Sequence, residues 1–183
     1  MNVYDFDKTI YDGDSSIDFY KFNLKRTPRL GKLWFKQAGA ALKYKLGKHD
    51  KTAMKTEFYK YFTLIDDIDQ AIEEFWIAHK HKIQPWYLEQ KRSDDVIVSA
   101  SPEFLLQPIC KELGVALIGS VVDPHTGRNL RPNCYGSEKV TRFNEHFSVD
   151  EIEEFYSDSY SDDPLAQFAK KSFFVVKDEL RPW

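Results

Sequence analysis

The chain opens on a short apolar run that ends in two aspartates. Residues 3–6 (Val-Tyr-Asp-Phe) predict a buried strand, and the polar sequence Asp7-Lys8-Thr9 follows directly. Side chains alternate along a strand, so the carboxylates of Asp5 and Asp7 project to the same side at its carboxyl end, where ligands bind in an open α/β sheet. Adjacent carboxylates repel each other. Such a pair therefore usually has a cation bound between its members or takes part in proton transfer. The alternative is a strand end that turns into solvent.

The second half of the chain alternates short apolar runs with amphipathic stretches. This alternation predicts an α/β fold with a doubly wound, Rossmann-like parallel sheet. Strands are expected at residues 95–99, 115–122, 155–157 and 173–176, with a return strand that could begin at Leu130, and helices at residues 102–113, 136–147 and 165–170.

The region between the first strand and this alternating half is helical in pattern. We expect a core domain made of residues 1–14 and 91–183, with an all-helical cap of residues 15–90 inserted after the first strand. The second cap helix is expected over residues 29–46, with basic residues on one face. Its apolar positions with three-and-four spacing are Leu30, Leu33, Trp34, Ala38, Ala41 and Leu42.

Charge is distributed unevenly along the chain. The 183 residues carry a net charge of only −3, so no overall field indicates nucleic acid. Residues 25–60 nevertheless hold eleven Lys or Arg against Asp50 and Glu57, a local charge of +9 that leaves −12 on the remainder. A cover that attracts anions over a core that binds cations and a set of solvated helix faces explain this equally well.

Cysteine usage and hydropathy indicate the compartment. Cys110 and Cys134 are the only cysteines and form no CxxC motif, which is typical of reduced thiols in the cytosol. The first strand leaves no room for a signal peptide, and the least polar stretch, residues 33–46, is interrupted by lysines. We expect a cytoplasmic protein without a transmembrane segment. Peripheral contact with the inner face of an anionic membrane is an open alternative.

Polar residues stand where four of these elements end or begin. The carboxyl ends of parallel strands converge, so these side chains could meet in one crevice. Together they suit phosphoryl transfer: one carboxylate attacks phosphorus, a second moves the proton, a hard divalent cation neutralises phosphate oxygens, and a lysine and a hydroxyl hold the remaining charge. The residues are Asp5, Asp7, Ser99, Lys139, Asp158 and Asp162.

The order of these motifs resembles that of the haloacid dehalogenase-like (HAD) hydrolases. The four sequences are D-F-D-K-T at residues 5–9, I-V-S at 97–99, G-S-E-K at 136–139 and S-D-S-Y-S-D-D-P at 157–164. The helical insert is similar to the cap of the phosphoserine phosphatase-like subgroup (subfamily IB). The form Y-S-D-S-x-x-D-x-P-L of the fourth motif also resembles phosphatidylglycerophosphate phosphatases.

The resemblance implies a role for each matching residue. Asp5 would be the nucleophile and Asp7 the general acid and base, a residue that the dehalogenases of the family lack. Ser99, Ala100 and Lys139 would bind the phosphate. Asp5, Asp158 and Asp7, whose main-chain carbonyl faces the metal, would form a Mg²⁺ site that Asp162 and Thr9 support.

The sequence departs from the family pattern at three places. Lys8 stands where the family most often has Gly. Its side chain could reach the substrate phosphate or point outward, and we favour the outward position because lysines are mostly exposed. Ala100-Ser101-Pro102 replaces the Gly pair that is typical of phosphoserine phosphatases, and the insert has no clear counterpart of their carboxylate-binding arginine. Phosphoserine is therefore not favoured as the substrate.

The resemblance thus implies a Mg²⁺-dependent phosphatase that hydrolyses a phosphate monoester through a phospho-aspartate intermediate. Its partner would be a phosphorylated small molecule or a phospholipid head group. The alternatives are a lipid phosphatase of the phosphatidylglycerophosphate type at a membrane surface, a nucleic-acid end phosphatase, and a binding module without activity. No strong nucleic-acid signal is present in the sequence.

Overall fold

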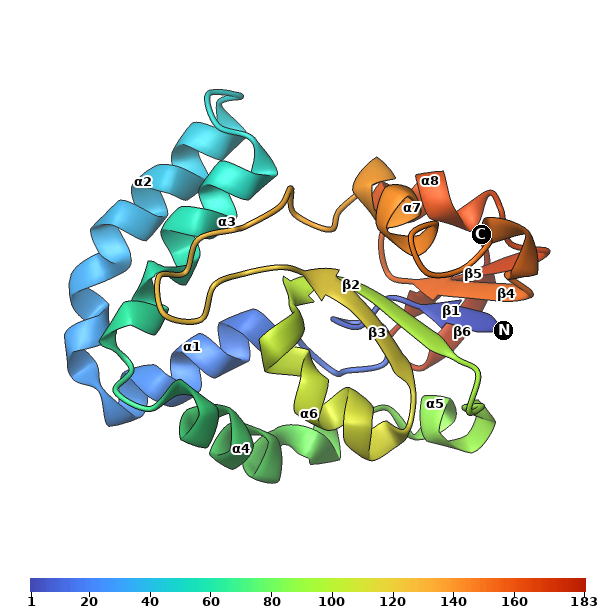
Figure 1. Cartoon of the computed structure of the whole chain (residues 1–183), viewed down its shortest axis with the longest axis horizontal. Coiled ribbons are helices and arrows are strands. Elements are labelled where there is room, and N and C mark those ends of the chain that lie inside the picture. Colours follow the sequence, from blue (N-terminus) through green and yellow to red (C-terminus); the bar gives the residue numbers. More distant parts are fainter.

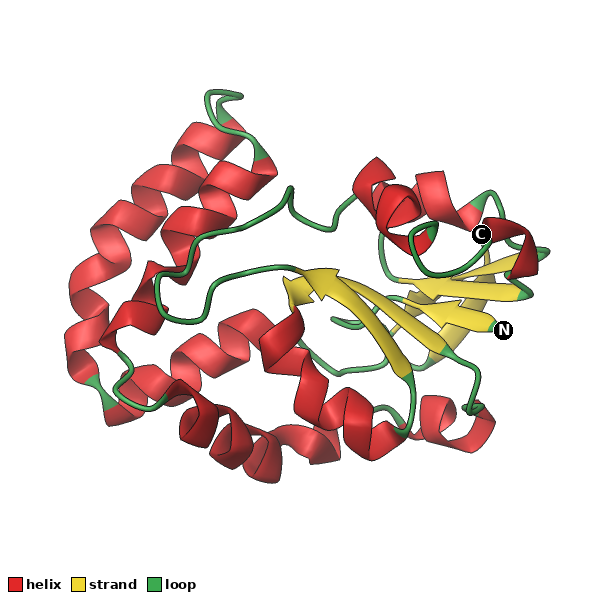
Figure 2. Cartoon of the chain, viewed as in Figure 1, coloured by secondary structure: helices red, strands yellow, loops and turns green.

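The computed structural model describes residues 1–183 and contains one six-stranded sheet with helices around it (Figures 1 and 2). The strand order is β3-β2-β1-β4-β5-β6; the first five strands are parallel, and β6 pairs antiparallel with β5. This is the doubly wound α/β fold expected from the sequence. The strands are β1 (Asn2–Tyr4), β2 (Val96–Pro102), β3 (Ala116–Ser120), β4 (Glu154–Ser157), β5 (Lys171–Val176) and β6 (Glu179–Pro182).

Helices form the insert after β1 and the crossovers between strands. Five α-helices lie between β1 and β2, and three follow later in the chain. They are α1 (Ser15–Arg26), α2 (Trp34–Lys45), α3 (Lys51–Tyr59), α4 (Ile68–His79), α5 (Pro85–Gln90), α6 (Glu103–Leu113), α7 (Ser137–Phe143) and α8 (Asp163–Ala166). Shorter 3₁₀ turns are Pro28–Leu33, Lys60–Leu64, Lys80–Lys82, Val149–Glu151 and Tyr160–Asp162.

Strand β1 occupies the centre of the sheet. Val3 pairs with Val96 of β2 on one side and with Phe155 of β4 on the other. All three residues of β1 are buried, including the polar Asn2, as expected for a central strand covered on both faces. Because β1, β2 and β4 are parallel neighbours, the residues that follow each of them gather at one edge of the sheet.

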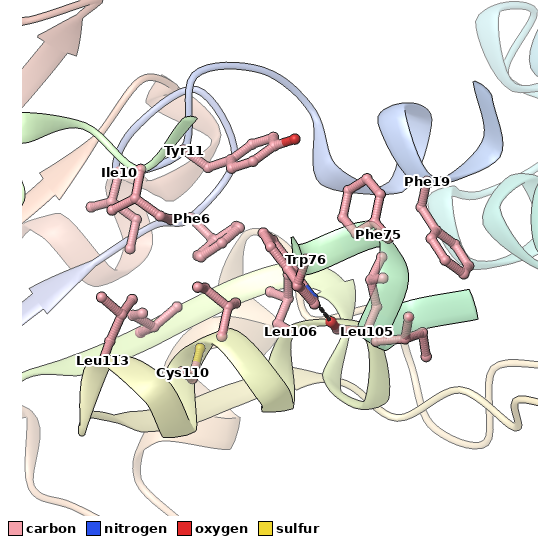
Figure 3. Close-up of a cluster of buried hydrophobic side chains, with 14 of the residues drawn as sticks. Phe6, Ile10, Tyr11, Phe19, Phe75, Trp76, Leu105, Leu106, Cys110 and Leu113 are labelled. Atoms are coloured by element: carbon pink, nitrogen blue, oxygen red, sulfur yellow. Dashed lines mark hydrogen bonds between the residues drawn. The ribbon is translucent and has the colours of Figure 1, made fainter. Parts of the chain in front are cut away.

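One continuous aromatic core joins the insert to the sheet. Phe6, which follows β1, packs edge-on against Trp76 of α4, with ring centroids 6.0 Å apart. Figure 3 shows the Trp76 indole Nε1 donating to the main-chain oxygen of Leu105 in α6, at 2.6 Å. Phe19 of α1 and Phe75 of α4 continue the same cluster, with centroids 5.3 Å apart. Helices α1 and α4 are therefore packed as part of the main core, and the division into core and cap stays a prediction.

A long loop of residues 121–136 runs from β3 to the α2–α3 pair before it returns to α7 (Figure 1). Asn129 Nδ2 donates to Thr56 Oγ1 of α3 at 2.9 Å, and the main-chain nitrogen of Asn133 donates to Thr52 Oγ1 at 3.0 Å. Gly127 has a φ of +68°, and a Cβ there would lie 2.3 Å from the Tyr59 carbonyl oxygen. This loop therefore fixes α3 against the α/β part of the molecule.

Several expected elements differ from those observed. The helix expected over residues 29–46 starts as a 3₁₀ turn and becomes α-helical at Trp34, and much of its apolar stripe faces solvent. Leu130 starts no strand, since this loop contains only an isolated bridge between Val122 and Asn129. The helix expected over residues 165–170 ends at Ala166, and the terminal strand β6 was not predicted.

Two further features concern the cysteines and the helices. Cys110 and Cys134 are both buried and form no disulfide in this structure. None of the helices combines the length and the apolar composition needed to cross a membrane.

Candidate active site

The residues that follow β1, β2 and β4 line a cleft of about 160 Å³. Five carboxylates and four lysine ammonium groups face the cleft, so its lining is strongly charged but has a net charge close to zero. The lining residues are Asp5, Asp7, Lys8, Asp14, Lys51, Lys55, Ala100, Tyr135, Lys139, Asp158, Ser159, Ser161 and Asp162. Of the expected site residues, Asp5, Asp7, Ala100, Lys139, Asp158 and Asp162 meet here.

Lys139 connects the first and fourth motifs. It lies in the first turn of α7, only 1% exposed, and its ammonium donates to Asp5 Oδ1 at 2.8 Å and to Asp162 Oδ2 at 2.7 Å. Ser157, the last residue of β4, also donates to Asp162 Oδ2, at 2.7 Å. Asp5 Oδ2 accepts no hydrogen bond, so one oxygen of Asp5 is fixed and the other remains free on the cleft side.

The charges of Asp5 and Lys139 are strongly coupled. Burial raises the pKa of Asp5 to about 7, against the lowering effect of the Lys139 ammonium. Burial acts to lower the pKa of Lys139, but the carboxylates of Asp162 and Asp5 outweigh it, and the net shift is upward. Lys139 is therefore a permanent cation that pairs with the Asp5 carboxylate. Without this cation, burial of the carboxylate would cost free energy.

The carboxylate of Asp7 is held at both oxygens. The main-chain nitrogen of Ser15, at the start of α1, donates to Oδ1 at 2.7 Å, and Ser101 Oγ donates to Oδ2 at 2.6 Å. Burial, followed by the nearby carboxylate of Asp14, raises the pKa of Asp7 to about 6. A carboxyl group with this pKa can give and take a proton near neutral pH.

Asp158 follows β4 and faces the cleft opposite the β1 residues. Its main-chain nitrogen donates to Thr9 Oγ1 at 3.1 Å, so the buried Thr9 fixes the turn that carries Asp158. Burial raises the pKa of the Asp158 carboxyl group, with Lys8 acting in the opposite direction. An uncompensated carboxylate of this kind favours a cation beside it.

The donors present fit a hard divalent cation. No group of three His, Cys, Asp or Glu side chains is gathered for a site made of side chains alone. The expected set is smaller, because it consists of two carboxylates, Asp5 and Asp158, and the Asp7 main-chain carbonyl. Mg²⁺ is usually bound by one or two carboxylates and completes its shell with water and phosphate oxygens, so this oxygen-only set suits it.

The second motif is arranged differently from what its sequence suggested. Ser99 is 1% exposed, does not line the cleft, and its Oγ accepts a hydrogen bond from the main-chain nitrogen of Ser101 at 3.1 Å. Ala100 lines the cleft instead. Ser101, whose only sequence signal is its departure from the family pattern, donates to Asp7 Oδ2.

Two lysines of α3 were not predicted as site residues. Lys51 and Lys55 lie one helical turn apart and both line the cleft, although they are more than forty residues from the nearest motif. The ammonium of Lys51 lies 3.9 Å from the centroid of the Tyr135 ring, and that of Lys55 lies 5.3 Å from the Tyr59 ring. The local excess of basic residues was the only sequence signal that pointed to them.

The electrostatics of the two α3 lysines differ. Burial and the neighbouring Lys55 lower the pKa of Lys51. Burial also acts to lower the pKa of Lys55, but Tyr59 and the carboxylates of Asp14 and Asp7 reverse it and raise that pKa overall. Lys55 is therefore held as a cation by the acidic side of the cleft.

Lys8 also differs from expectation. Its side chain is exposed, as predicted, but it does not point away from the site, because it lines the cleft beside Asp158. Its φ of +58° belongs to the left-handed region, which is uncommon for residues other than Gly. This explains why Gly suits the position.

The chain matches the family described as haloacid dehalogenase-like hydrolase over residues 3–167. This span contains the cleft and all four motifs. The chain belongs to the HAD-like hydrolase family. No relative was found among curated proteins. The likeness to phosphatidylglycerophosphate phosphatases stays a prediction.

Solved structures share the HAD-like fold over most of this chain. A protein of unknown function from Bordetella pertussis Tohama I is 21% identical, with 94% of this chain and 87% of that chain covered and a TM-score of 0.80. A phosphoserine phosphohydrolase-like protein from Francisella tularensis subsp. tularensis SCHU S4 is 16% identical, with 94% and 86% covered and a TM-score of 0.56. A phosphoserine phosphatase solved as a phospho-aspartyl intermediate analogue is 15% identical, with 93% and 83% covered and a TM-score of 0.52.

Proposed function

We propose that the protein is a Mg²⁺-dependent phosphomonoesterase that works through a phospho-aspartate intermediate on Asp5. The observation that carries this proposal is the unequal environment of the two Asp5 oxygens. Lys139 binds Oδ1, while Oδ2 is free beside the cleft. A buried carboxylate with one fixed and one free oxygen is prepared for nucleophilic attack.

In the first step, Asp5 Oδ2 attacks the phosphorus of the ester and forms an acyl phosphate. The bond between phosphorus and the ester oxygen breaks, and the leaving oxygen takes a proton from Asp7. A pKa of about 6 allows Asp7 to supply this proton. The hydrogen bonds from Ser15 and Ser101 hold its carboxyl group in place.

In the second step, Asp7 acts in the opposite direction. Its carboxylate accepts a proton from a water molecule, and the resulting hydroxide oxygen attacks the phosphorus of the acyl phosphate. The bond between phosphorus and Asp5 Oδ2 breaks, which releases inorganic phosphate and restores the Asp5 carboxylate. Lys139 stays paired with Asp5 and Asp162 throughout and offsets the negative charge that gathers at this end of the cleft.

Asp5, Asp158 and the Asp7 carbonyl would hold the metal ion. When bound, Mg²⁺ would neutralise phosphoryl oxygens and so lower the repulsion between the phosphate and the Asp5 carboxylate. Asp162 and Thr9 would act indirectly, because Asp162 fixes Lys139 and Thr9 fixes the turn of Asp158. Ala100 would lie against the phosphoryl group, and Ser99 would keep the second motif in shape through Ser101.

The substrate that suits this cleft carries a second negative group besides its phosphate. Lys139 is already paired with carboxylates, whereas Lys51 and Lys55 have no salt-bridge partner within 4.0 Å. A phosphorylated small molecule with a carboxylate or a further phosphate could bind both ends of the cleft. The structural neighbours that are phosphoserine phosphatases support the reaction class, and Lys51 and Lys55 support a substrate richer in negative charge.

The proposal is tested by phosphate release from a panel of phosphate monoesters, with Mg²⁺ and after its removal by EDTA. We expect activity that requires the metal and falls at least a thousandfold in Asp5→Asn. Trapping of ³²P on the wild-type protein, absent from Asp5→Asn, would identify the intermediate. Full activity of Asp5→Asn would show that the nucleophile is another residue. A protein that binds Mg²⁺ but hydrolyses no ester would be a binding module.

A further inference from the structure

The outer face of α2 is an exposed apolar stripe. Phe35 is 80% exposed, Leu42 58% and Leu46, directly after the helix, 61%. The spacings of seven and four residues place these three side chains on one side of the helix, and Ala38 lies between them. Trp34, 58% exposed, stands next to Phe35 with ring centroids 5.2 Å apart. We call Trp34, Phe35, Ala38, Leu42 and Leu46 the outer face.

The opposite side of α2 makes the contacts with the rest of the molecule. Ala40 is buried, and Gln37 Nε2 donates to the Phe58 carbonyl oxygen in α3 at 3.0 Å. Leu33, directly before the helix, packs against the main core. The outer face is therefore a second apolar surface on the same helix, and folding of the chain does not use it. Contiguous exposed apolar surface of this kind marks an interaction site.

Lysines surround the outer face. Residues 29–48 contain six basic residues and no Asp or Glu. Arg29 pairs with Asp66, whereas none of the five lysines has a carboxylate within 4.0 Å. They stand on both flanks of the apolar stripe and at its two ends: Lys32, Lys36, Lys43, Lys45 and Lys48.

Exposed apolar side chains flanked by unpaired lysines favour one kind of binding partner. A second copy of the chain placed against the outer face would bring two sets of unpaired lysines together, and like charges oppose such a contact. An anionic lipid surface accepts both parts: the aromatic and leucine side chains enter the boundary between head groups and acyl chains, and the lysines remain at the head groups. We propose that α2 docks the protein on anionic membranes through the outer face.

This docking is independent of the reaction in the cleft. Helix α3 lies between the outer face and the cleft, since α2 packs on α3 and α3 supplies Lys51 and Lys55 (Figure 1). A docked molecule therefore keeps its cleft away from the lipid plane. The outer face attaches the protein, and a soluble phosphate ester remains accessible to the site.

The test is binding to vesicles of phosphatidylcholine with 30% phosphatidylglycerol, measured by sedimentation and by the part of the tryptophan emission that Trp34→Phe removes, since the chain has four tryptophans. We expect binding at about 20 mM salt, a blue shift of the emission, and release at about 500 mM salt, because screening weakens attraction at the surface. Phe35→Ser with Leu42→Ser should lose binding at least tenfold. Lys36→Gln with Lys43→Gln should lose about fivefold per lysine.

The control is Ile77→Ser on α4, which removes an apolar side chain that is 76% exposed outside the outer face. It should leave vesicle binding unchanged. Hydrolysis of soluble esters should be equal in all variants, so failure of the docking and failure of the proposed activity are distinguishable. The proposal would be overturned by any of three results. These are vesicle binding that persists in Phe35→Ser with Leu42→Ser, no binding of the wild type at low salt, and a dimer of the chain that only these substitutions dissociate.

Discussion

The ammonium of Lys51 lies 3.9 Å from the centre of the Tyr135 ring, so the inserted helices and the α/β part of the chain meet directly at the cleft. Lys51 begins α3, and Tyr135 stands just before α7. A cation over an aromatic face is attracted by the ring electrons. This contact, together with the loop of residues 121–136, determines where the α3 lysines stand relative to Asp5.

Loss of the α3 lysines should change substrate preference more than catalysis. In Lys51→Ala with Lys55→Ala, we expect the Michaelis constant for para-carboxyphenyl phosphate to rise about tenfold or more, since a hydrogen bond to a charged group contributes about 1.5–3 kcal/mol. The kcat/KM for phenyl phosphate should change much less. Steady-state kinetics with both esters checks this. Lys48→Ala, an exposed lysine outside the cleft, is the matched control, and an equal loss for both esters would contradict a second anion site.

Ser101 should act by positioning Asp7. Ser101→Ala removes the hydrogen bond to Asp7 Oδ2, and we expect kcat to fall about tenfold while KM stays nearly constant. Ser172→Ala is the control, because it deletes a comparable hydrogen bond, from Ser172 Oγ to the Ala166 oxygen, away from the cleft. Similar losses of kcat in both variants would mean that general destabilisation, rather than placement of the proton donor, explains the effect.

Replacement of Lys139 should reduce both stability and activity. Lys139→Met leaves the carboxylates of Asp5 and Asp162 without a cation in a buried site, which costs roughly 3–5 kcal/mol of unfolding free energy. Addition of Asp162→Asn should recover part of the stability but no activity. Urea denaturation and phosphate release measure the two effects separately. Recovery of activity in the double variant would show that Lys139 only balances charge.

The loop of residues 121–136 should depend on Gly127. In Gly127→Val, a Cβ would overlap the Tyr59 carbonyl, so we expect a loss of about 2–4 kcal/mol of stability and weaker retention of α3. Gly47→Val is the control: its φ of +69° is equally unfavourable for Val, but no atom lies within 4 Å. The difference between the two variants isolates the contact with α3. Equal stabilities would show that the contact contributes nothing.

Much of the site was predictable because strand ends are encoded locally. Asp5, Asp7 and Asp158 each follow a short apolar run that forms a strand. Because β1 and β4 pair in parallel, the three residues lie at the same edge of the sheet. The parallel order of the strands followed from their alternation with helices. The hairpin between β5 and β6 was missed because its turn uses Lys177, at a φ of +61°, where glycine would have been the usual signal.

Contacts over long sequence distances could not be predicted in this way. Lys51 and Lys55 enter the cleft only because the loop of residues 121–136 fixes α3, and no local pattern encodes that contact. The three-and-four spacing in α2 correctly indicated an amphipathic helix. It did not show that Leu42 faces solvent, since periodicity identifies a stripe but not its partner.

The aromatic core shared by Phe6 and Trp76 restricts how this molecule can move and diversify. A rigid rotation of all the inserted helices would have to pull α1, α4 and Tyr59 of α3 out of the main core. The α2–α3 hairpin has few buried side chains, since Ala40 is the only buried residue of α2 and Tyr59 the only one of α3. The same hairpin carries the α3 lysines on one side and the outer face on the other. Substitutions of these residues would alter what the protein accepts and where it resides without removing a side chain from the main core.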